Sequence, residues 1–255
     1  MAYEDTTEVL AENNNKKVDV IIKRYKEAEG LKDNWKDKFE EAYEYCLPSR
    51  ESFYEESAGQ KRTDKIFDET AVVGIQEFAS RLQAGIVPTF ARWANFEAGS
   101  EIPEENVEEV NEQLDNITTY IFEMLSSSNF NQEVHESFMD LAVGTGIMLV
   151  EEGDAINPIR FSSISLPNAC LMNGPTNKID AVYRKRKCKL NEIEIMYPKA
   201  KVPSEVMSTM NPEKNCTILD AVYRVYDEPN VEKHKHCVIL MDKKTIVLDE
   251  EFEGV

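Results

Sequence analysis

Apolar residues in the first part of the chain recur at the three- and four-residue spacings of amphipathic helices. This pattern predicts helices over residues 18–29, 31–46, 65–85, 101–124 and 130–142. Glycines, prolines and capping residues stand between them, and such residues interrupt helical backbone or bond its unpaired amide groups. The chain up to residue 146 is therefore predicted to be helical.

Several boundaries of these helices can be predicted from single residues. Gly30 is expected to end the first helix, because glycine often stops helical backbone. The polar residues 49–63 are expected to form a loop, after which Asp64 caps the helix of residues 65–85. Residues 1–17 are polar and acidic, and we expect them to form a flexible arm.

The helix predicted over residues 101–124 carries the most regular apolar stripe. Ser100 is its expected N-cap, and Pro103 fits the first turn. The apolar positions alternate spacings of three and four residues: Val107, Val110, Leu114, Ile117, Ile121 and Met124. A stripe of this kind packs on another helix. That helix belongs either to the same subunit or to a neighbouring one.

Residues 86–99 break the helical pattern and bring three aromatic residues close together in the sequence. They are Phe90, Trp93 and Phe96. Aromatic side chains are enriched at the centres of protein interfaces, so these three are candidates for a contact between subunits. An equally good interpretation is that they cover the local core.

After Gly146 the apolar period changes from that of helices to the alternation of strands. Asn173-Gly174 is a turn signal, and a short helix is expected over residues 191–196. Strands are predicted over residues 147–150, 159–163, 169–172, 179–186, 217–226, 237–241 and 245–248. The predicted fold class is α+β: a helical half, residues 18–146, followed by a mostly antiparallel, β-rich subdomain, residues 147–255.

The charge of the chain argues against some classes of function. Its 48 acidic and 29 basic residues give a formal charge of −19, which repels a phosphate backbone and argues against a sequence reader of DNA. A channel through which DNA must slide benefits from such weak affinity. No apolar run approaches the roughly 18 residues of a membrane helix, so no membrane partner is expected.

The sequence offers no strong catalytic, cofactor-binding or metal-ligating motif, and we expect none of these sites. Five cysteines are scattered without a metal or disulfide spacing, which indicates reduced thiols in a cytoplasmic setting. His234 and His236 alternate on a strand, but no second ligand pair stands near them. Arg184 and Arg186 share one face of a predicted strand and could meet DNA phosphates or an acidic partner. The alternative is an exposed strand protected by its charge.

Four segments together resemble the portal, or head-to-tail connector, proteins of short-tailed bacteriophages. In chain order they are NWKDKFEEAYEYCLPSRESF, KIFDETAVVGIQEFASRLQAGIVPTFARWANFEAG, VGTGIMLVEEG and FSSISLPNACLMNGPTNKIDAVYRKRKCKLNEI. They occur in the order of that family over roughly residues 30–250. Portal subunits are normally longer, with a stem helix pair and a clip that follow. We therefore expect this chain to be the wing-like N-terminal part of such a subunit.

The resemblance implies a structural protein that is not an enzyme. It implies a ring of about twelve identical subunits at one capsid vertex, through which double-stranded DNA passes without sequence-specific binding. The implied partners are further copies of the chain, the major capsid protein, the terminase motor and tail adaptor proteins. The expected location is the portal vertex of the virion, with assembly in the host cytoplasm.

Two other functions compete with this interpretation. Another virion structural protein, such as a head–tail adaptor or a scaffold, would share the acidity and the helices but not the ordered segments. An enzyme with an acidic metal site would need paired carboxylates in a pocket.

Overall fold

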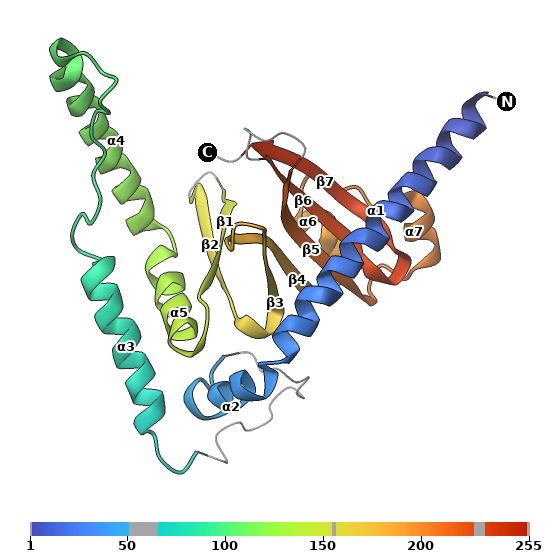
Figure 1. The fold of residues 1–255 in the computed structure, drawn as a ribbon, viewed down its shortest axis with the longest axis horizontal. Helices are drawn as coiled ribbons and strands as arrows, with labels where there is room; N and C mark the ends of the chain where they lie inside the picture. The colour runs from blue at the N-terminus through green and yellow to red at the C-terminus, as the bar shows by residue number, and fades with distance from the viewer. Residues whose placement is uncertain (1, 51–65, 155–156, 227–232, 254–255) are drawn as a thin grey trace. The chain divides into compact units, whose positions relative to one another are not determined.

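The computed structural model describes residues 2–50, 66–154, 157–226 and 233–253 (Figure 1). It divides into two compact units. Residues 1–36 and 168–255 form a sheet unit, and residues 37–167 form a helical unit. The predicted helix cap Asp64 and most of the predicted loop at residues 49–63 lie outside the described residues.

The sheet unit is built on five antiparallel strands in sequence order, β3-β4-β5-β6-β7. Each strand pairs antiparallel with the next one along the chain. A short turn joins β3 to β4, whereas residues 190–214 join β4 to β5. The strands are β3 (Ala169–Asn173), β4 (Ile179–Lys189), β5 (Asn215–Val225), β6 (Lys233–Leu240) and β7 (Thr245–Glu253).

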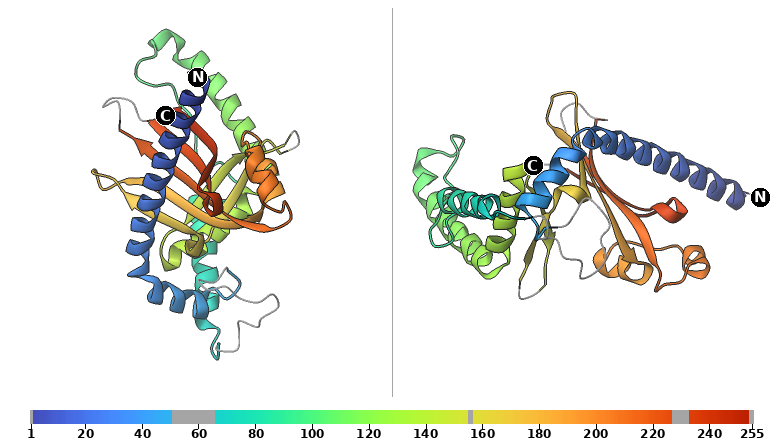
Figure 2. Two further views of the ribbon diagram at one scale, coloured as in Figure 1. Left: turned by 90° about the vertical axis from the view of Figure 1, so that its right-hand side faces the viewer. Right: turned by 90° about the horizontal axis from the view of Figure 1, so that it is seen from below.

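Helix α1 (Ala2–Asp33) lies across one face of this sheet (Figure 2). Four of its residues at spacings of three and four are buried against the sheet: Val18, Ile21, Tyr25 and Ala28. The Tyr25 ring meets the ring of Tyr183 edge to face, with 6.1 Å between centroids. One face of the helix therefore packs on the strand residues that point to the same side of the sheet.

The other face of the sheet is partly covered by two short helices. They are α6 (Ile193–Met196), preceded by a 3-10 turn at Leu190–Glu192, and α7 (Ser204–Thr209). Leu190, Ile193 and Val206 are buried there against the strands. The backbone amide of Lys201 donates to the Val247 carbonyl at 2.8 Å and so protects part of the β7 edge.

The helical unit contains four helices and one hairpin within its described residues. The helices are α2 (Lys36–Cys46), α3 (Thr70–Ile86), α4 (Val107–Ser127) and α5 (Phe130–Val143). The hairpin joins β1 (Ile147–Glu152) and β2 (Ile159–Ile164). Helix α3 packs along α5, and α5 packs on the hairpin. The Asn129 side-chain amide donates to the Phe161 carbonyl and accepts from the Phe161 amide. These two bonds pair backbone groups of β2 that no neighbouring strand would otherwise bond.

A buried ion pair holds the core of the helical unit together. The Asp140 side chain in α5 is completely buried and binds the Arg50 guanidinium, which follows α2 in the chain. The Tyr43 hydroxyl donates to Asp140 at 2.7 Å and accepts from the Leu166 backbone amide at 3.2 Å. Arg50 also binds Glu136 and the Ser163 hydroxyl. Three segments distant in sequence, residues 43–50, 136–140 and 163–166, are thus joined by one polar network.

The predicted α+β class is confirmed, with helices mainly in the N-terminal half and antiparallel strands in the C-terminal half. The switch from helix to strand falls at Gly146, as predicted, but the compact units divide the chain elsewhere. Helix α1 belongs to the sheet unit, because its apolar face packs on the strands.

The first helix differs from its prediction at both ends. It begins at Ala2, so residues 2–17, which we expected to belong to an arm, are helical. Once a packed turn has formed, each further residue adds a hydrogen bond without a new nucleation cost, which favours extension. Gly30 does not end the helix, which continues to Asp33.

The starts of α3 and α4 also differ from the prediction. Helix α3 begins at Thr70, where Asp68 accepts bonds from the Thr70 amide and hydroxyl. Phe67 was predicted on its apolar face but precedes the helix and is 97% exposed. Helix α4 begins at Val107, not after Ser100, because a turn and a 3-10 segment intervene. Helix α7 was not predicted, since the prolines around it obscure its period.

Candidate interaction surfaces

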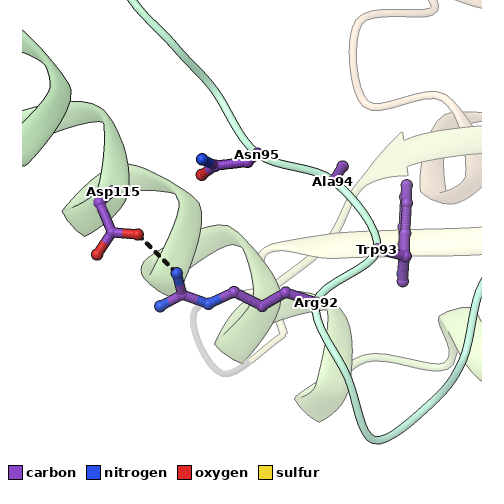
Figure 3. Close-up of a pocket in the computed structure, with 5 residues that line it drawn as sticks. All are labelled: Arg92, Trp93, Ala94, Asn95 and Asp115. Atoms are coloured by element: carbon purple, nitrogen blue, oxygen red, sulfur yellow. Dashed lines mark hydrogen bonds and ion pairs between the residues drawn. The ribbon is translucent and has the colours of Figure 1, made fainter.

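The extended segment before α4 runs along that helix and is fastened to it by side chains (Figure 3). The Arg92 guanidinium donates to the Asp115 carboxylate at 2.7 Å and also binds the Thr119 hydroxyl. Further along, the Ala98 amide donates to the Asn111 side chain at 2.8 Å. These bonds use one flank of α4 and fix the segment against it.

Trp93 anchors the same segment in an aromatic cluster. Its ring meets Phe122 of α4 edge to face at 5.3 Å and stacks on Phe130 of α5 at 6.3 Å. Phe130 in turn contacts Phe161 of β2 at 5.0 Å. Such pairs add stability beyond the area that they bury. Trp93 therefore covers the local core, one of the two interpretations of the aromatic residues.

The two other aromatic residues of the segment point to a different role. Phe90 is 89% exposed and Phe96 is 51% exposed. Apolar side chains this exposed on a rigid segment are typical of surfaces that meet a partner. The contact between subunits that we predicted for Phe90, Trp93 and Phe96 remains a prediction, and its two exposed members carry it.

Five of the six residues in the apolar stripe of α4 are half-buried, and the sixth, Ile117, is 50% exposed. Helix α4 contacts α5, and the fastened segment covers a neighbouring flank. Which of the two predicted helices, one of the same subunit or one of a neighbouring subunit, packs along the stripe stays a prediction.

Arg184 and Arg186 lie on β4 with their side chains on the same face of the sheet, as predicted from strand alternation. Arg186 donates to the Tyr197 hydroxyl at 3.0 Å and lies over the Tyr197 ring. Arg184 is opposite Asp220 of β5. Both arginines are half-buried, and contact of either with DNA or a partner remains a prediction.

Arg186 belongs to a polar cluster that the sequence did not reveal. The Asp220 carboxylate accepts from the Tyr197 hydroxyl at 2.7 Å and contacts His236 Nε2 at 2.8 Å. Burial acts to raise the pKa of Asp220, but the bond and charge of His236, with Tyr197 and Arg186, outweigh it and lower that pKa. The one signal in the sequence is a lone carboxylate between Leu219 and Ala221 in an apolar strand.

The exposed basic residues of β4 are on the opposite face of the sheet. Lys185 and Lys187 are exposed on the face that α1 crosses. His234 and His236 share a face, as expected, but His234 stacks on Phe252 while His236 binds Asp220. Within the described ranges, no group of three or more His, Cys, Asp or Glu residues is placed to hold a metal ion. Among the described helices, none combines the length and the apolar character needed to cross a membrane.

The chain belongs to the family of bacteriophage head to tail connecting proteins, whose model matches residues 18–248. It is also 22% identical over 204 residues to a protein of Bordetella phage BPP-1 named "Probable portal protein". That match covers 78% of this chain but 36% of the relative, so the chain spans about a third of the relative's length. The resemblance seen in the sequence is confirmed.

Proposed function

We propose that this chain is the wing-like part of a portal subunit that forms a ring at one vertex of the capsid. The family match over residues 18–248 carries the proposal. The ring would conduct DNA during packaging and ejection and would hold the tail. Its role would be to shape the ring. Identical subunits in head-to-tail contact form a closed ring when the rotation from one subunit to the next adds up to a full turn. Covalent chemistry, including ATP hydrolysis, belongs to partner proteins.

The acidity of the chain supports a conduit that does not grip DNA. Lysine and arginine contacts with phosphates produce most of the nonspecific affinity of proteins for DNA. The helical unit contains 26 acidic and 8 basic residues, whereas the sheet unit contains 22 and 21. The helical unit therefore carries a formal charge of −18 and the sheet unit −1. Double-stranded DNA would pass such a surface without sequence-specific binding.

The partners follow from this position in the particle. They are further copies of the chain in a ring of about twelve, the major capsid protein, the terminase motor and the tail adaptors. Assembly in the host cytoplasm would precede incorporation at the portal vertex of the virion. Phe90 and Phe96 would contribute to contacts between subunits, and Arg184 and Arg186 would support contact with an acidic partner.

The test is to remove the protein from the phage that encodes it and to examine the heads by electron microscopy. A portal subunit is essential for DNA entry, so the expected result is heads without DNA, rescued by the wild-type gene. Filled heads without tails would indicate a head–tail adaptor instead. Malformed heads whose core proteins fail to organise would indicate a scaffold.

A further inference from the structure

Two cysteines of the sheet unit lie directly opposite each other on neighbouring strands. Cys188, near the C-terminal end of β4, pairs in register with Cys216, near the N-terminal end of β5. Both side chains are buried in the apolar cluster that contains residues of α6 and α7. They are 28 positions apart in the chain, so their spacing in the sequence did not indicate a contact.

The geometry of this pair fits a disulfide bond. Directly opposite residues of an antiparallel pair have Cα atoms about 4.5–5.5 Å apart. That range lies within the roughly 4.4–6.8 Å that separates the Cα atoms of disulfide-bonded cysteines. The Cys216 thiol already points at its partner, because it donates to the Cys188 carbonyl at 3.2 Å.

The two other cysteines of the sheet unit cannot bridge in this way. Cys170 on β3 and Cys237 on β6 belong to the cluster on the face that α1 crosses. Three strand spacings separate β3 from β6, which is about 14 Å. Within this unit, a disulfide is therefore possible only between Cys188 and Cys216.

The pair stands at the base of the segment that carries α6 and α7. This segment, residues 190–214, leaves the sheet after β4 and returns to it at β5. Noncovalent bonds already join its two ends: the Asn191 amide donates to the Pro212 carbonyl at 3.3 Å, and Lys189 pairs with Glu213 at 3.0 Å. A covalent bond between the two cysteines would close the segment into a loop and restrict the unfolded chain.

We propose that Cys188 and Cys216 form a redox-sensitive clamp, which a low-molecular-weight disulfide such as oxidised glutathione closes. One cysteine thiolate attacks the reagent, forms a mixed disulfide and releases one reagent thiol. The second thiolate displaces the other reagent thiol and completes the protein disulfide. Two electrons pass from the protein sulfur atoms to the reagent, and the two cysteine protons pass to the released thiols. The inference does not depend on the ring.

Burial decides when this clamp can close. Burial raises the pKa of the Cys216 thiol, and burial with the charge and bond of Cys216 raises that of Cys188 to about 12. Both groups are therefore protonated near neutral pH, whereas the thiolate is the reacting form. Oxidation of the folded protein should be slow at pH 7 and faster at higher pH. A reducing cytoplasm would keep the clamp open, and oxidising surroundings outside the cell would close it.

The first test maps the disulfides after the full-length protein is refolded from urea with oxidised glutathione, because refolding removes the barrier of burial. Non-reducing digestion and mass spectrometry should show the Cys188 and Cys216 peptides joined with the loss of two hydrogen atoms. Dithiothreitol should separate them again. The inference is overturned if these peptides stay unlinked, carry only glutathione or join to other cysteines.

The second test compares Cys216→Ala with Cys170→Ala, each of which removes one buried thiol from the sheet unit. Oxidation should raise the midpoint of thermal unfolding of wild type and of Cys170→Ala but not of Cys216→Ala. Circular dichroism checks that each variant folds, and the oxidised and reduced wild-type proteins give the comparison if a variant does not. An oxidised wild-type protein whose midpoint is unchanged or lower would overturn the clamp. Light scattering on the same samples reports ring assembly separately, so failure of the proposed function would be recognised as such.

Discussion

At the scale of single residues, Asp140 links parts of the helical unit, because its fully buried carboxylate binds both Arg50 and Tyr43. We predict that Asp140→Ala lowers the free energy of unfolding by about 3–5 kcal/mol, since it removes the fully buried partner of the Arg50 charge and leaves Glu136 as its remaining carboxylate partner. Urea denaturation followed by circular dichroism measures this change.

The matched control is the exposed ion pair of Arg81 with Glu77 on α3. Arg81→Ala should change the free energy of unfolding by less than about 1 kcal/mol, because exposed ion pairs contribute little. Equal effects of Asp140→Ala and Arg81→Ala would show that the buried network does not stabilise the unit as described.

Asp220 links the stability of the sheet unit to pH. Its pKa is lower in the folded protein than in the unfolded chain, where it is about 3.9. The stabilisation that it provides is therefore complete well above that pH and is lost as the pH falls through the folded pKa. We predict that Asp220→Asn lowers stability at pH 7 and makes the loss of stability on acidification shallower.

Urea denaturation between pH 7 and about pH 3 tests this linkage. Asp19→Asn serves as the control, because the Asp19 carboxylate pairs with Lys244 at the exposed surface of the same unit. An acid dependence of Asp220→Asn identical to that of the wild-type protein would contradict the role of the cluster.

At the level of elements, the aromatic residues of the segment before α4 have two possible roles, covering the local core or contacting another subunit. The sequence alone could not distinguish these roles. We predict that Trp93→Ala lowers the free energy of unfolding by roughly 2 kcal/mol, less than a fully buried tryptophan, because the ring stacks on Phe130 but is part-exposed. Phe90→Ala should leave stability within about 0.5 kcal/mol of wild type and weaken ring assembly instead. Thermal unfolding and light scattering on the same samples distinguish the two effects, and a large stability loss in Phe90→Ala would contradict them.

The elements themselves were largely predictable because each has an uninterrupted period. The stripe of α4 and the alternation of β5 set both their type and their extent, and the turn at Asn173-Gly174 does join β3 to β4. Boundaries set by local backbone bonds were less predictable. Asp68 bonds the start of α3 at Thr70, and Ser100 stands too far from α4 to cap it.

The polar clusters were beyond prediction for a different reason. Arg50 and Asp140 are separated by 90 positions in the chain, and only tertiary packing brings them together. The Asp220 cluster likewise joins residues from three strands with Tyr197, which directly follows α6. The spacing of residues in a single sequence does not reveal such pairs. The exposed aromatic residues Phe90 and Phe96 could be named as candidates because their segment interrupts the helical pattern.

For the whole molecule, the uneven distribution of charge is the feature that connects fold and function. A helical unit with a formal charge of −18 is joined in the chain to a nearly neutral sheet unit rich in lysine and arginine. In a ring of identical subunits, contacts between unlike units avoid the repulsion that contacts between two helical units would create. In the proposed ring, the same acidity would keep the affinity for DNA low.

The ring is the central claim of this account, and native mass spectrometry of the full-length protein tests it most directly. The account predicts one dominant species whose mass is a whole multiple of the subunit mass, about twelve copies, with a central hole in negative-stain images. A full-length protein that remains a monomer or a small dimer under the same conditions would contradict it.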